Sequence, residues 1–435
     1  MPSPGIDARA GLSPYRIVVF LVHFPVPVLE SRDTCFNQNP ETRSPAVSRP
    51  GGPDVVMRSR TVHLSGGTYP RDLLVEAAKD AGRPPDFALA FLPPEEGLRD
   101  TLAAMTAAWP DAQRFGCEAV TQFGDAGMTS RGVVQLFWFD DPRHHRISLE
   151  VIPGTHGEPP APKRVEAVAR RIAAGDGTLL LVDGLRFPAE RFLAELRRTL
   201  VTMPPLVAGG LASQREPVRK AGARVFVGDR VLPSACLAVT FHGISMRVEV
   251  VRGWTPASPV YKVTRAEGSV VSEIDGEPAT DWYRRFFTVD GHLAPMPESA
   301  NRFPLIIEGP RPERQGLYRS LRFFDDPPGA VTFWGEVETG DQVRLGMGNG
   351  HSLVRTASEL TAGPPPEAAI LYSCVGRELV LGDMASQEAA TIHKALGGIS
   401  LSGFFTFGEI GPTARGNLAY YNQTAILVLL REVGA

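Results

Sequence analysis

The chain has 435 residues, of which 43% are hydrophobic and 21% charged, and its formal net charge is -3. This length and hydrophobic content predict a globular protein with two or more domains, not a chain dominated by disorder. The small net charge excludes a general basic footprint for nucleic acid. The four cysteines stand singly, at positions 35, 117, 236 and 374. They predict neither a disulfide framework nor a zinc site, and they favour a reducing cytoplasm.

Residues 1–56 are predicted to form a disordered tail, because they are rich in Pro, Ser and Arg and lack periodicity. The one apolar run, residues 17–29, is broken by Pro25 and Pro27 and is too short to span a bilayer. We therefore expect no membrane contact through this segment, and globular structure from Met57 onward.

Three later stretches share one order of elements: a strand, an amphipathic helix, a strand containing glycine and a final strand. The first comprises residues 87–92, 98–109, 115–118 and 133–139; the second 178–182, 188–200, 206–212 and 235–241; the third 368–372, 386–396, 399–410 and 425–430. The spacing is that of a repeated supersecondary unit. Strand-helix-strand is also the commonest vocabulary of α/β proteins, so duplication and coincidence both remain open.

Residues 246–359 differ, with short β-prone runs separated by turn residues such as Asp275-Gly276. We expect antiparallel sheet here, including a hairpin between residues 330–337 and 342–347. The predicted class is α/β or α+β, with repeated strand-helix-strand units forming mixed sheets flanked by helices and an antiparallel β-rich middle section.

The third stretch has the most unusual residue choices. Ser373-Cys374-Val375-Gly376-Arg377 follows a strand, where small residues and glycine predict a turn with close backbone approach. Further along come the segments Gly403-Phe404-Phe405-Thr406-Phe407-Gly408-Glu409-Ile410 and Asn422-Gln423-Thr424.

On these three segments the chain resembles FIST-domain proteins, a bacterial family of intracellular sensory modules in signal transduction. The resemblance runs from about residue 87 to residue 432. It implies a FIST amino-terminal domain over 57–280 and a FIST carboxy-terminal domain over 281–435. It also implies a small-molecule ligand, with amino acids suggested for the family and haem-based nitric oxide sensing for some members. Output would lie in a separate protein, such as a histidine kinase.

The chain departs from the family pattern at two places. After Gly116-Cys117 it has Glu118-Ala119-Val120-Thr121-Gln122, where the family tends to have small hydroxyl residues and a glycine-glutamate pair. Tyr421 stands where a histidine commonly precedes Asn422. We therefore expect the ligand over Gly376, Gly403 and Gly408, not over the Gly116 turn.

The candidate ligand-binding side chains are polar and follow strands. Arg377 suits a carboxylate, with a salt bridge to Glu378 as the alternative. Glu409 suits an ammonium, and backbone capping of the neighbouring loop is the alternative. Asn422, Gln423 and Thr424 suit neutral polar groups or merely satisfy a turn. The remaining candidates around this location are Ser373, Cys374, Gly376, Gly403, Phe404, Thr406 and Gly408.

No catalytic motif is evident, so the sequence predicts a binding protein and not an enzyme. The rival enzyme would use Cys374 as a nucleophile, since Arg377 nearby in sequence favours a thiolate; the alternative is a small buried residue. Phe404 is expected to line either the pocket or the core. The nine histidines form no metal-spaced cluster, so we predict no metal and no resident cofactor, with haem as the alternative.

Overall fold

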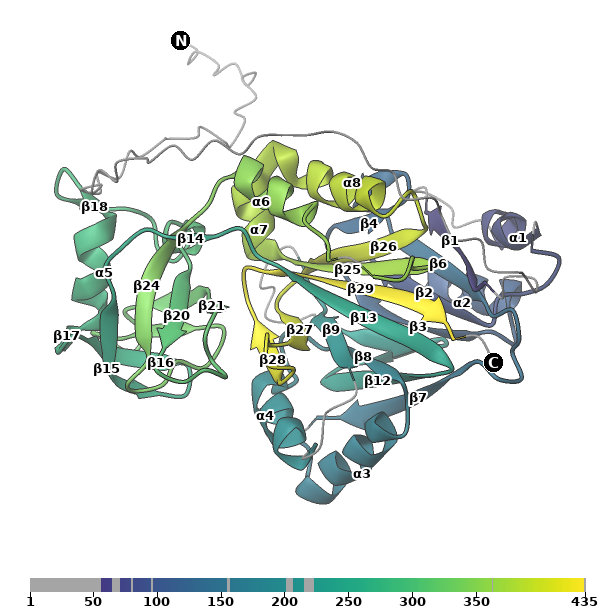
Figure 1. Ribbon diagram of the computed structural model, residues 1–435, viewed down its shortest axis with the longest axis horizontal. Coiled ribbons are helices and arrows are strands. Elements are labelled where there is room, and N and C mark those ends of the chain that lie inside the picture. Colours follow the sequence, from purple (N-terminus) through teal and green to yellow (C-terminus); the bar gives the residue numbers. More distant parts are fainter. Residues whose placement is uncertain are drawn as a thin grey trace, which may run out of the picture.

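The structure is a computed structural model that describes residues 56–64, 71–79, 81–94, 97–154, 157–200, 206–214, 223–361 and 363–433. The tail predicted for residues 1–56 lies outside these ranges except for its last residue. Figure 1 shows a large body of sheets and helices beside a smaller β-rich unit.

The body contains three six-stranded mixed sheets, and the fold class predicted from sequence is confirmed. In spatial order, the first sheet comprises β1 (Arg58–His63), β6 (Val133–Trp138), β2 (Phe87–Leu92), β3 (Gln113–Glu118), β10 (Val225–Val227) and β11 (Arg230–Leu232). The second comprises β7 (Arg146–Pro153), β12 (Ala235–His242), β8 (Gly177–Val182), β9 (Leu206–Leu211), β27 (Glu409–Pro412) and β28 (Leu418–Tyr421). The third comprises β13 (Ile244–Val251), β29 (Ala425–Glu432), β25 (Ala368–Cys374), β26 (Leu401–Thr406), β4 (Gln122–Gly124) and β5 (Gly127–Thr129).

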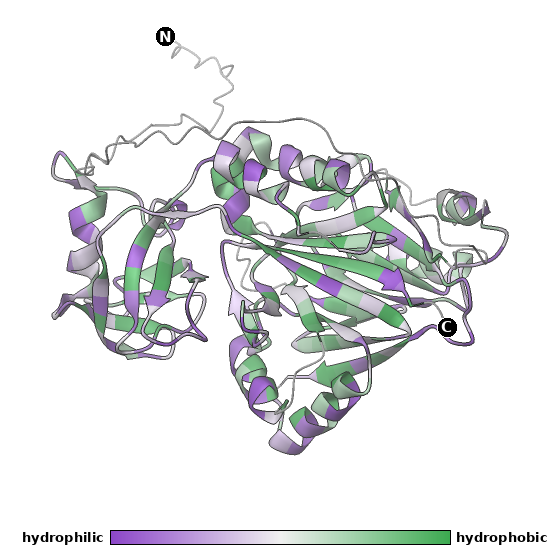
Figure 2. Cartoon of the chain, in the orientation of Figure 1, coloured by the Kyte–Doolittle hydropathy of each residue, from purple (hydrophilic) through white to green (hydrophobic). Residues whose placement is uncertain are grey.

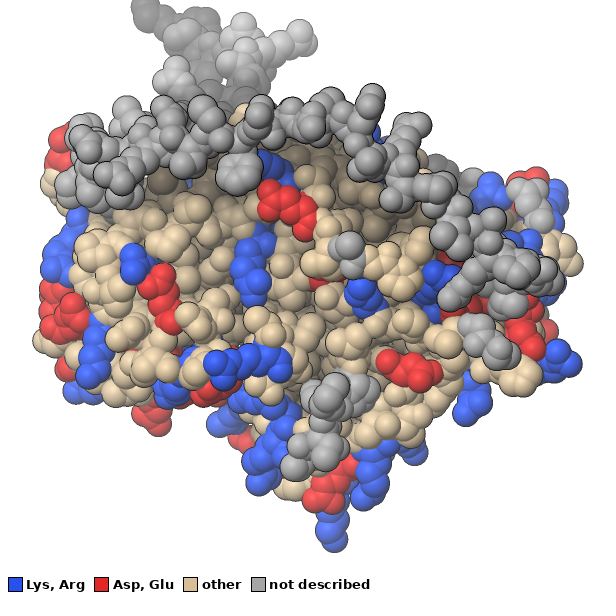
Figure 3. Space-filling view, viewed as in Figure 1, with Lys and Arg blue, Asp and Glu red and all other residues tan. Residues whose placement is uncertain are grey.

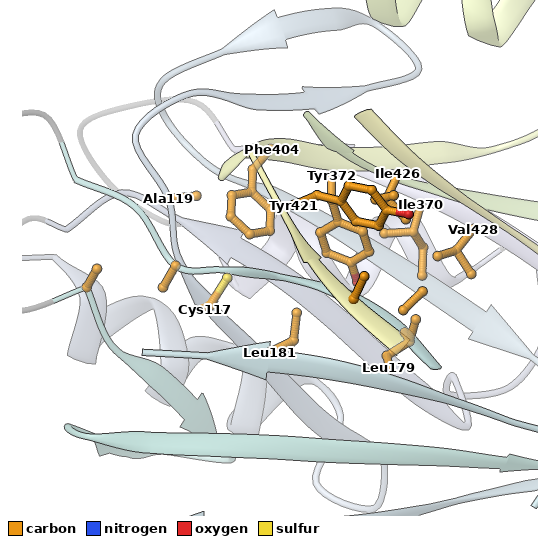
Figure 4. Close-up of a cluster of buried hydrophobic side chains, with 14 of the residues drawn as sticks. Cys117, Ala119, Leu179, Leu181, Ile370, Tyr372, Phe404, Tyr421, Ile426 and Val428 are labelled. Atoms are coloured by element: carbon orange, nitrogen blue, oxygen red, sulfur yellow. The ribbon is translucent and has the colours of Figure 1, made fainter. Parts of the chain in front are cut away.

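Each sheet packs one face against its own helices. The helices are α1 (Arg71–Lys79) and α2 (Leu98–Ala108) on the first sheet, α3 (Pro162–Ala173) and α4 (Ala189–Thr199) on the second, and α6 (Gly350–Ala357), α7 (Val375–Leu381) and α8 (Ala385–Ala395) on the third. The other faces meet in a central core, part of which is drawn in Figure 4, where Cys117, Leu181 and Tyr372 come from three different sheets. In Figure 2 hydrophobic residues predominate along many of the central strands, while the helices carry many hydrophilic ones.

The three units predicted from the sequence exchange hairpins in a cycle. Hairpin β4–β5 follows β3 but extends the third sheet through β26, and β10–β11 follows β9 but extends the first sheet through β3. Hairpin β27–β28 follows β26 and extends the second sheet through β9. Every sheet is therefore completed by a hairpin from another unit, which supports a true internal repeat.

Glycine occupies the same place in all three units. Gly116 pairs with Ala90, Gly209 with Leu180 and Gly403 with Leu371, and each partner is the fourth residue of its strand. A Cβ at these glycines would lie 1.8, 1.9 and 2.0 Å from the partner's carbonyl oxygen. The close approach of two strands therefore requires glycine three times over.

The β-rich unit, residues 252–349, is inserted between β13 and α6 and confirms the antiparallel middle section. Its nine-stranded sheet comprises β14 (Thr255–Pro256), β15 (Tyr261–Glu267), β16 (Val270–Ile274), β17 (Glu277–Pro278), β20 (Leu305–Gly309), β21 (Leu317–Arg319), β22 (Leu321–Phe324), β23 (Val331–Phe333) and β24 (Gln342–Met347). The unit also contains α5 (Ala279–Phe287), the 3₁₀ turn η1 (Ala300–Arg302) and the small hairpin β18 (Thr288–Val289) with β19 (His292–Leu293).

Two expectations for this region are wrong. Strand β23 pairs with β16 and β22, whereas β24 pairs with β14, β15 and β20, so the two do not form a hairpin. The connection between them holds Asp341, which is fully buried and accepts hydrogen bonds from Arg311 and Arg314. Strand β13, expected in the antiparallel section, belongs to the body because it pairs with β29.

Candidate functional site

The segment Ser373 to Arg377 is a direct transition from strand to helix. Strand β25 ends at Cys374 and α7 begins at Val375, so the loop-like turn expected from the small residues is absent. Gly376 is needed in the first turn of α7, since a Cβ there would lie 2.3 Å from Nε2 of Gln423. The helix start therefore packs directly on the segment that precedes β29.

A buried polar cluster, defined here as Cys374, Glu409, Tyr420, Asn422 and Thr424, lies at this end of β25. The Oε2 atom of Glu409 accepts hydrogen bonds from the backbone N–H (3.2 Å) and the hydroxyl (2.7 Å) of Thr424. The Cys374 thiol lies beside the same carboxyl, and the Tyr420 hydroxyl lies beside the Asn422 amide. Four of the five residues are no more than 3% exposed.

Burial controls the charge of this cluster. It raises the pKa of Glu409 to about 8, because the carboxylate form would lose its hydration, and the Thr424 hydrogen bonds oppose the shift only partly. Burial and the Glu409 carboxyl both raise the pKa of the Cys374 thiol well above its usual value. Both groups therefore favour their neutral forms at pH 7, and the thiolate that a cysteine nucleophile requires is disfavoured.

Three buried oxygen atoms in or next to the cluster have no hydrogen-bond partner among the described residues. Within the described part of the chain, no nitrogen or oxygen donor reaches Oε1 of Glu409 or Oδ1 of Asn422, and Oε1 of Gln423 is likewise unpaired. Buried polar atoms are almost always hydrogen-bonded in proteins, to protein or to water. Donors from water or from a bound molecule would complete the hydrogen bonding of these acceptors.

The structure brings together only part of the set predicted from sequence. Arg377 is fully buried, and its Nε donates to Oε1 of Glu388 at 3.0 Å, while Nη1 donates to the carbonyl of Arg252 at 2.6 Å. Ser373 donates to the other Glu388 oxygen at 2.6 Å. The salt-bridge partner is thus Glu388 on α8, and Glu378 instead accepts from Thr121. Whether Arg377 also binds a ligand stays a prediction.

Other predicted residues support the backbone around the cluster. The Thr406 hydroxyl lies within hydrogen-bonding distance of the backbone of Leu211 and Gly408, which joins β26 to the second sheet. A Cβ on Gly408 would lie 2.3 Å from the Tyr420 hydroxyl. Phe404 packs in the central core, with its ring centroid 4.7 Å from that of Phe91. Gln423 donates to the carbonyl of Asn301 and to Ser320, linking body and β-rich unit.

The equivalent positions of the other two units are satisfied internally. By register, Cys374 corresponds to Asp183, whose carboxylate accepts from the backbone of Leu185, Arg186 and Ser234 at 2.8–3.0 Å. Likewise Glu409 corresponds to Gln122, whose amide bonds to the carbonyl of Ala119 and the N–H of Gly132. Among the described residues at these compared positions, the unpaired acceptors lie in the third unit, where the sequence predicted the ligand.

An open groove of about 840 Å³ adjoins the cluster, between the body and the β-rich unit. Tyr420 lines the groove, and its hydroxyl faces the Asn422 amide, so this side chain separates the groove from the rest of the cluster. The body contributes residues around the start of α4, and the β-rich unit contributes the β15–β16 turn together with Arg322 and Trp334. Figure 3 shows charges of both signs interspersed on the side of the molecule that faces the viewer in Figure 1.

Sequence reasoning missed several residues at this interface. Arg319 is 2% exposed, donates to the carbonyls of Tyr318, Glu336 and Tyr420, and lies 3.9 Å from Glu190. Desolvation raises the pKa of Glu190. In the sequence, only Tyr420 could have been linked to the site, because it lies two residues before Asn422. Arg319 and Arg322 lie in the inserted β-rich unit, which has no recognisable motif. The described residues contain no group of three potential metal ligands, and none of their helices is long and apolar enough to cross a membrane.

Comparison with known proteins gives matches over most of the chain. Residues 86–277 match the family model of the FIST N domain, and residues 279–412 match that of the FIST C domain. An uncharacterized protein of Mycobacterium tuberculosis is 29% identical over 345 residues, which cover 76% of this chain and 86% of the relative. An uncharacterized protein of Mycobacterium bovis is 32% identical over 269 residues, covering 59% of this chain and 68% of the relative.

Proposed function

Because the chain belongs to the FIST family, whose domains are associated with sensory roles in signal transduction, we propose that it binds an amino-acid-like polar metabolite and signals to a separate output protein. The ligand binds where the groove meets the polar cluster, and no turnover accompanies binding. The observation that supports this location is the set of unpaired buried acceptors on Glu409, Asn422 and Gln423.

The chemistry of these acceptors suits a ligand that donates hydrogen bonds. A neutral Glu409 carboxyl and the Asn422 amide each have donor and acceptor atoms, so they can bind a neutral amide, and an arriving ammonium favours the Glu409 carboxylate because the two opposite charges then compensate each other. Tyr420 would have to move or share its hydroxyl as the ligand arrives. That movement is the conformational signal that we propose, because Tyr420 lies on β28, in the hairpin that completes the sheet of another unit.

The test is thermal stabilisation followed by calorimetry with the twenty common L-amino acids. A ligand at a hundredfold excess over its Kd stabilises a folded protein by about 2.7 kcal/mol. Asn422→Ala and Glu409→Gln should weaken the binding of any stabilising amino acid, whereas Asn417→Ala, in the turn between β27 and β28, should leave it unchanged. If no amino acid stabilises or binds the wild-type protein, the proposal is wrong.

A further inference from the structure

The guanidinium of Arg322 lies against two aromatic rings on the groove wall. The guanidinium carbon lies 4.4 Å from the ring centroid of Trp334 and 4.9 Å from that of Phe323. Trp334 stacks in turn on Phe407 of the body, with centroids 6.1 Å apart and an interplanar angle of 19°. Contact with aromatic faces fixes a planar guanidinium while its N–H groups stay available at the edge.

Those N–H groups have no acceptor among the residues that the structure describes. By contrast, the neighbouring Arg319 and Arg314 donate to backbone carbonyls, and Arg314 also to the carboxylate of Asp341. Arg322 and Trp334 both line the groove, and the Tyr420 ring is close enough to influence the Arg322 charge. Arg322 is therefore an exposed cation that lies against two aromatic rings next to the polar cluster and forms no ion pair with a described carboxylate.

The same groove offers carboxylates without a cation. Glu267 and Glu336 both line it, and neither forms an ion pair with any described residue. Their segments run side by side, since the N–H of Phe333 donates to Ser269 at 2.8 Å and that of Val337 to Gly268 at 3.1 Å. Apolar side chains complete the lining, including those of Leu185, Phe187 and Val270.

We propose that Arg322 binds the carboxylate of the ligand and that the ligand is a zwitterionic amino acid with an apolar side chain, lying in the groove. The inference rests on the proposed function and names its specificity-determining residue. A guanidinium binds a carboxylate through two parallel hydrogen bonds, the ammonium donates to the unpaired acceptors of the polar cluster, and Glu267 and Glu336 add negative charge to the groove. The apolar wall receives the side chain.

The experiment measures Kd by calorimetry for the tightest-binding L-amino acid and for its decarboxylated amine, which lacks only the carboxylate. The proteins are wild type, Arg322→Met and the matched control Arg302→Met, an exposed arginine of the same unit that does not line the groove. Loss of a charged hydrogen-bonding contact should weaken amino-acid binding roughly tenfold to a hundredfold in Arg322→Met. The variant should also lose the preference for the amino acid over the amine.

The outcomes separate this inference from the proposed function. Equal affinity in Arg322→Met and Arg302→Met would overturn the role of Arg322 while leaving amino-acid sensing intact. A retained preference for the amino acid over the amine in Arg322→Met would overturn it as well. Failure of the wild-type protein to bind any of the twenty amino acids would overturn the proposed function, and this inference with it.

Discussion

Replacing Arg377 with methionine should destabilise the fold strongly. Arg377 and Glu388 are both fully buried, and methionine would keep much of the side-chain volume while leaving the Glu388 carboxylate without its cation. Only the hydrogen bond from Ser373 would remain on that carboxylate. Breaking one partner of a buried ion pair typically costs about 3–5 kcal/mol. We expect a loss of this size in the free energy of unfolding, measured by urea denaturation.

The matched control is Arg344→Met. Arg344 pairs with Glu308 at 2.7 Å, but their side chains are 33% and 28% exposed, so the loss should stay below about 1 kcal/mol. In a double-mutant cycle, Glu388→Leu should recover part of the stability lost in Arg377→Met, because no buried charge is then left unpaired. A loss under about 1 kcal/mol in Arg377→Met, together with loss of amino-acid binding, would refute the structural role and favour a ligand contact.

Three further changes test the cluster and the repeat. In the folded protein the pKa of Glu409 is about 8, compared with 4.5 in an unfolded chain. The free energy of unfolding of the wild type should therefore fall as the pH rises from about 5 to 8, and Glu409→Gln should remove this part of the fall. If the urea midpoints of the two proteins change with pH in the same way, the expectation is wrong. Gly403→Ala should lower the free energy of unfolding by about 2 kcal/mol or more, because the new Cβ would clash with the Leu371 carbonyl. The loss should be smaller in the control Gly309→Ala, whose Cβ would meet only the flexible Gln342 at 3.4 Å. Equal melting temperatures of the two variants would refute the close approach of the strands. Iodoacetamide should label the buried Cys374 thiol at least about 100-fold more slowly in the folded protein than in the urea-unfolded protein. Mass spectrometry measures the two labelling rates, and equal rates would restore the nucleophile hypothesis.

The sequence predicted what depends on local patterns. Strand β25 and helix α8 are recognisable because apolar runs and helical periodicity are local properties, and the turn at Asp275-Gly276 follows from two residues with positive φ. The helix α7 was missed because its seven residues are too short for periodicity to show. The partner of Arg377 lies on the next helix, so choosing between Glu378 and Glu388 required the packing of α7 against α8.

The exchange of hairpins between the units could not be predicted from the sequence, for a different reason. Nothing local in residues 122–129 indicates that this hairpin joins a strand some 280 residues later, because each hairpin strand would fit the edge of any of the three similar sheets. The groove could not be predicted from the sequence either, because it also depends on contacts between distant parts of the chain. Arg322 and Trp334 come from an insertion whose position against the body depends on contacts such as that of Gln423 with Asn301.

The exchanged hairpins also connect the proposed ligand site to the rest of the body. Glu409 lies on β27, which pairs with β9 of the second unit, and Tyr420 lies on β28, which pairs with β27. Phe407, in the turn before β27, stacks on Trp334 of the groove wall. A shift of this hairpin therefore has to be absorbed by the second sheet. That sheet borders the first through the central core, and packed interfaces of this kind move between discrete arrangements instead of deforming continuously. Under the proposed function, a displacement of Tyr420 would be passed through these packed sheets to surfaces far from the groove, where an output protein would bind.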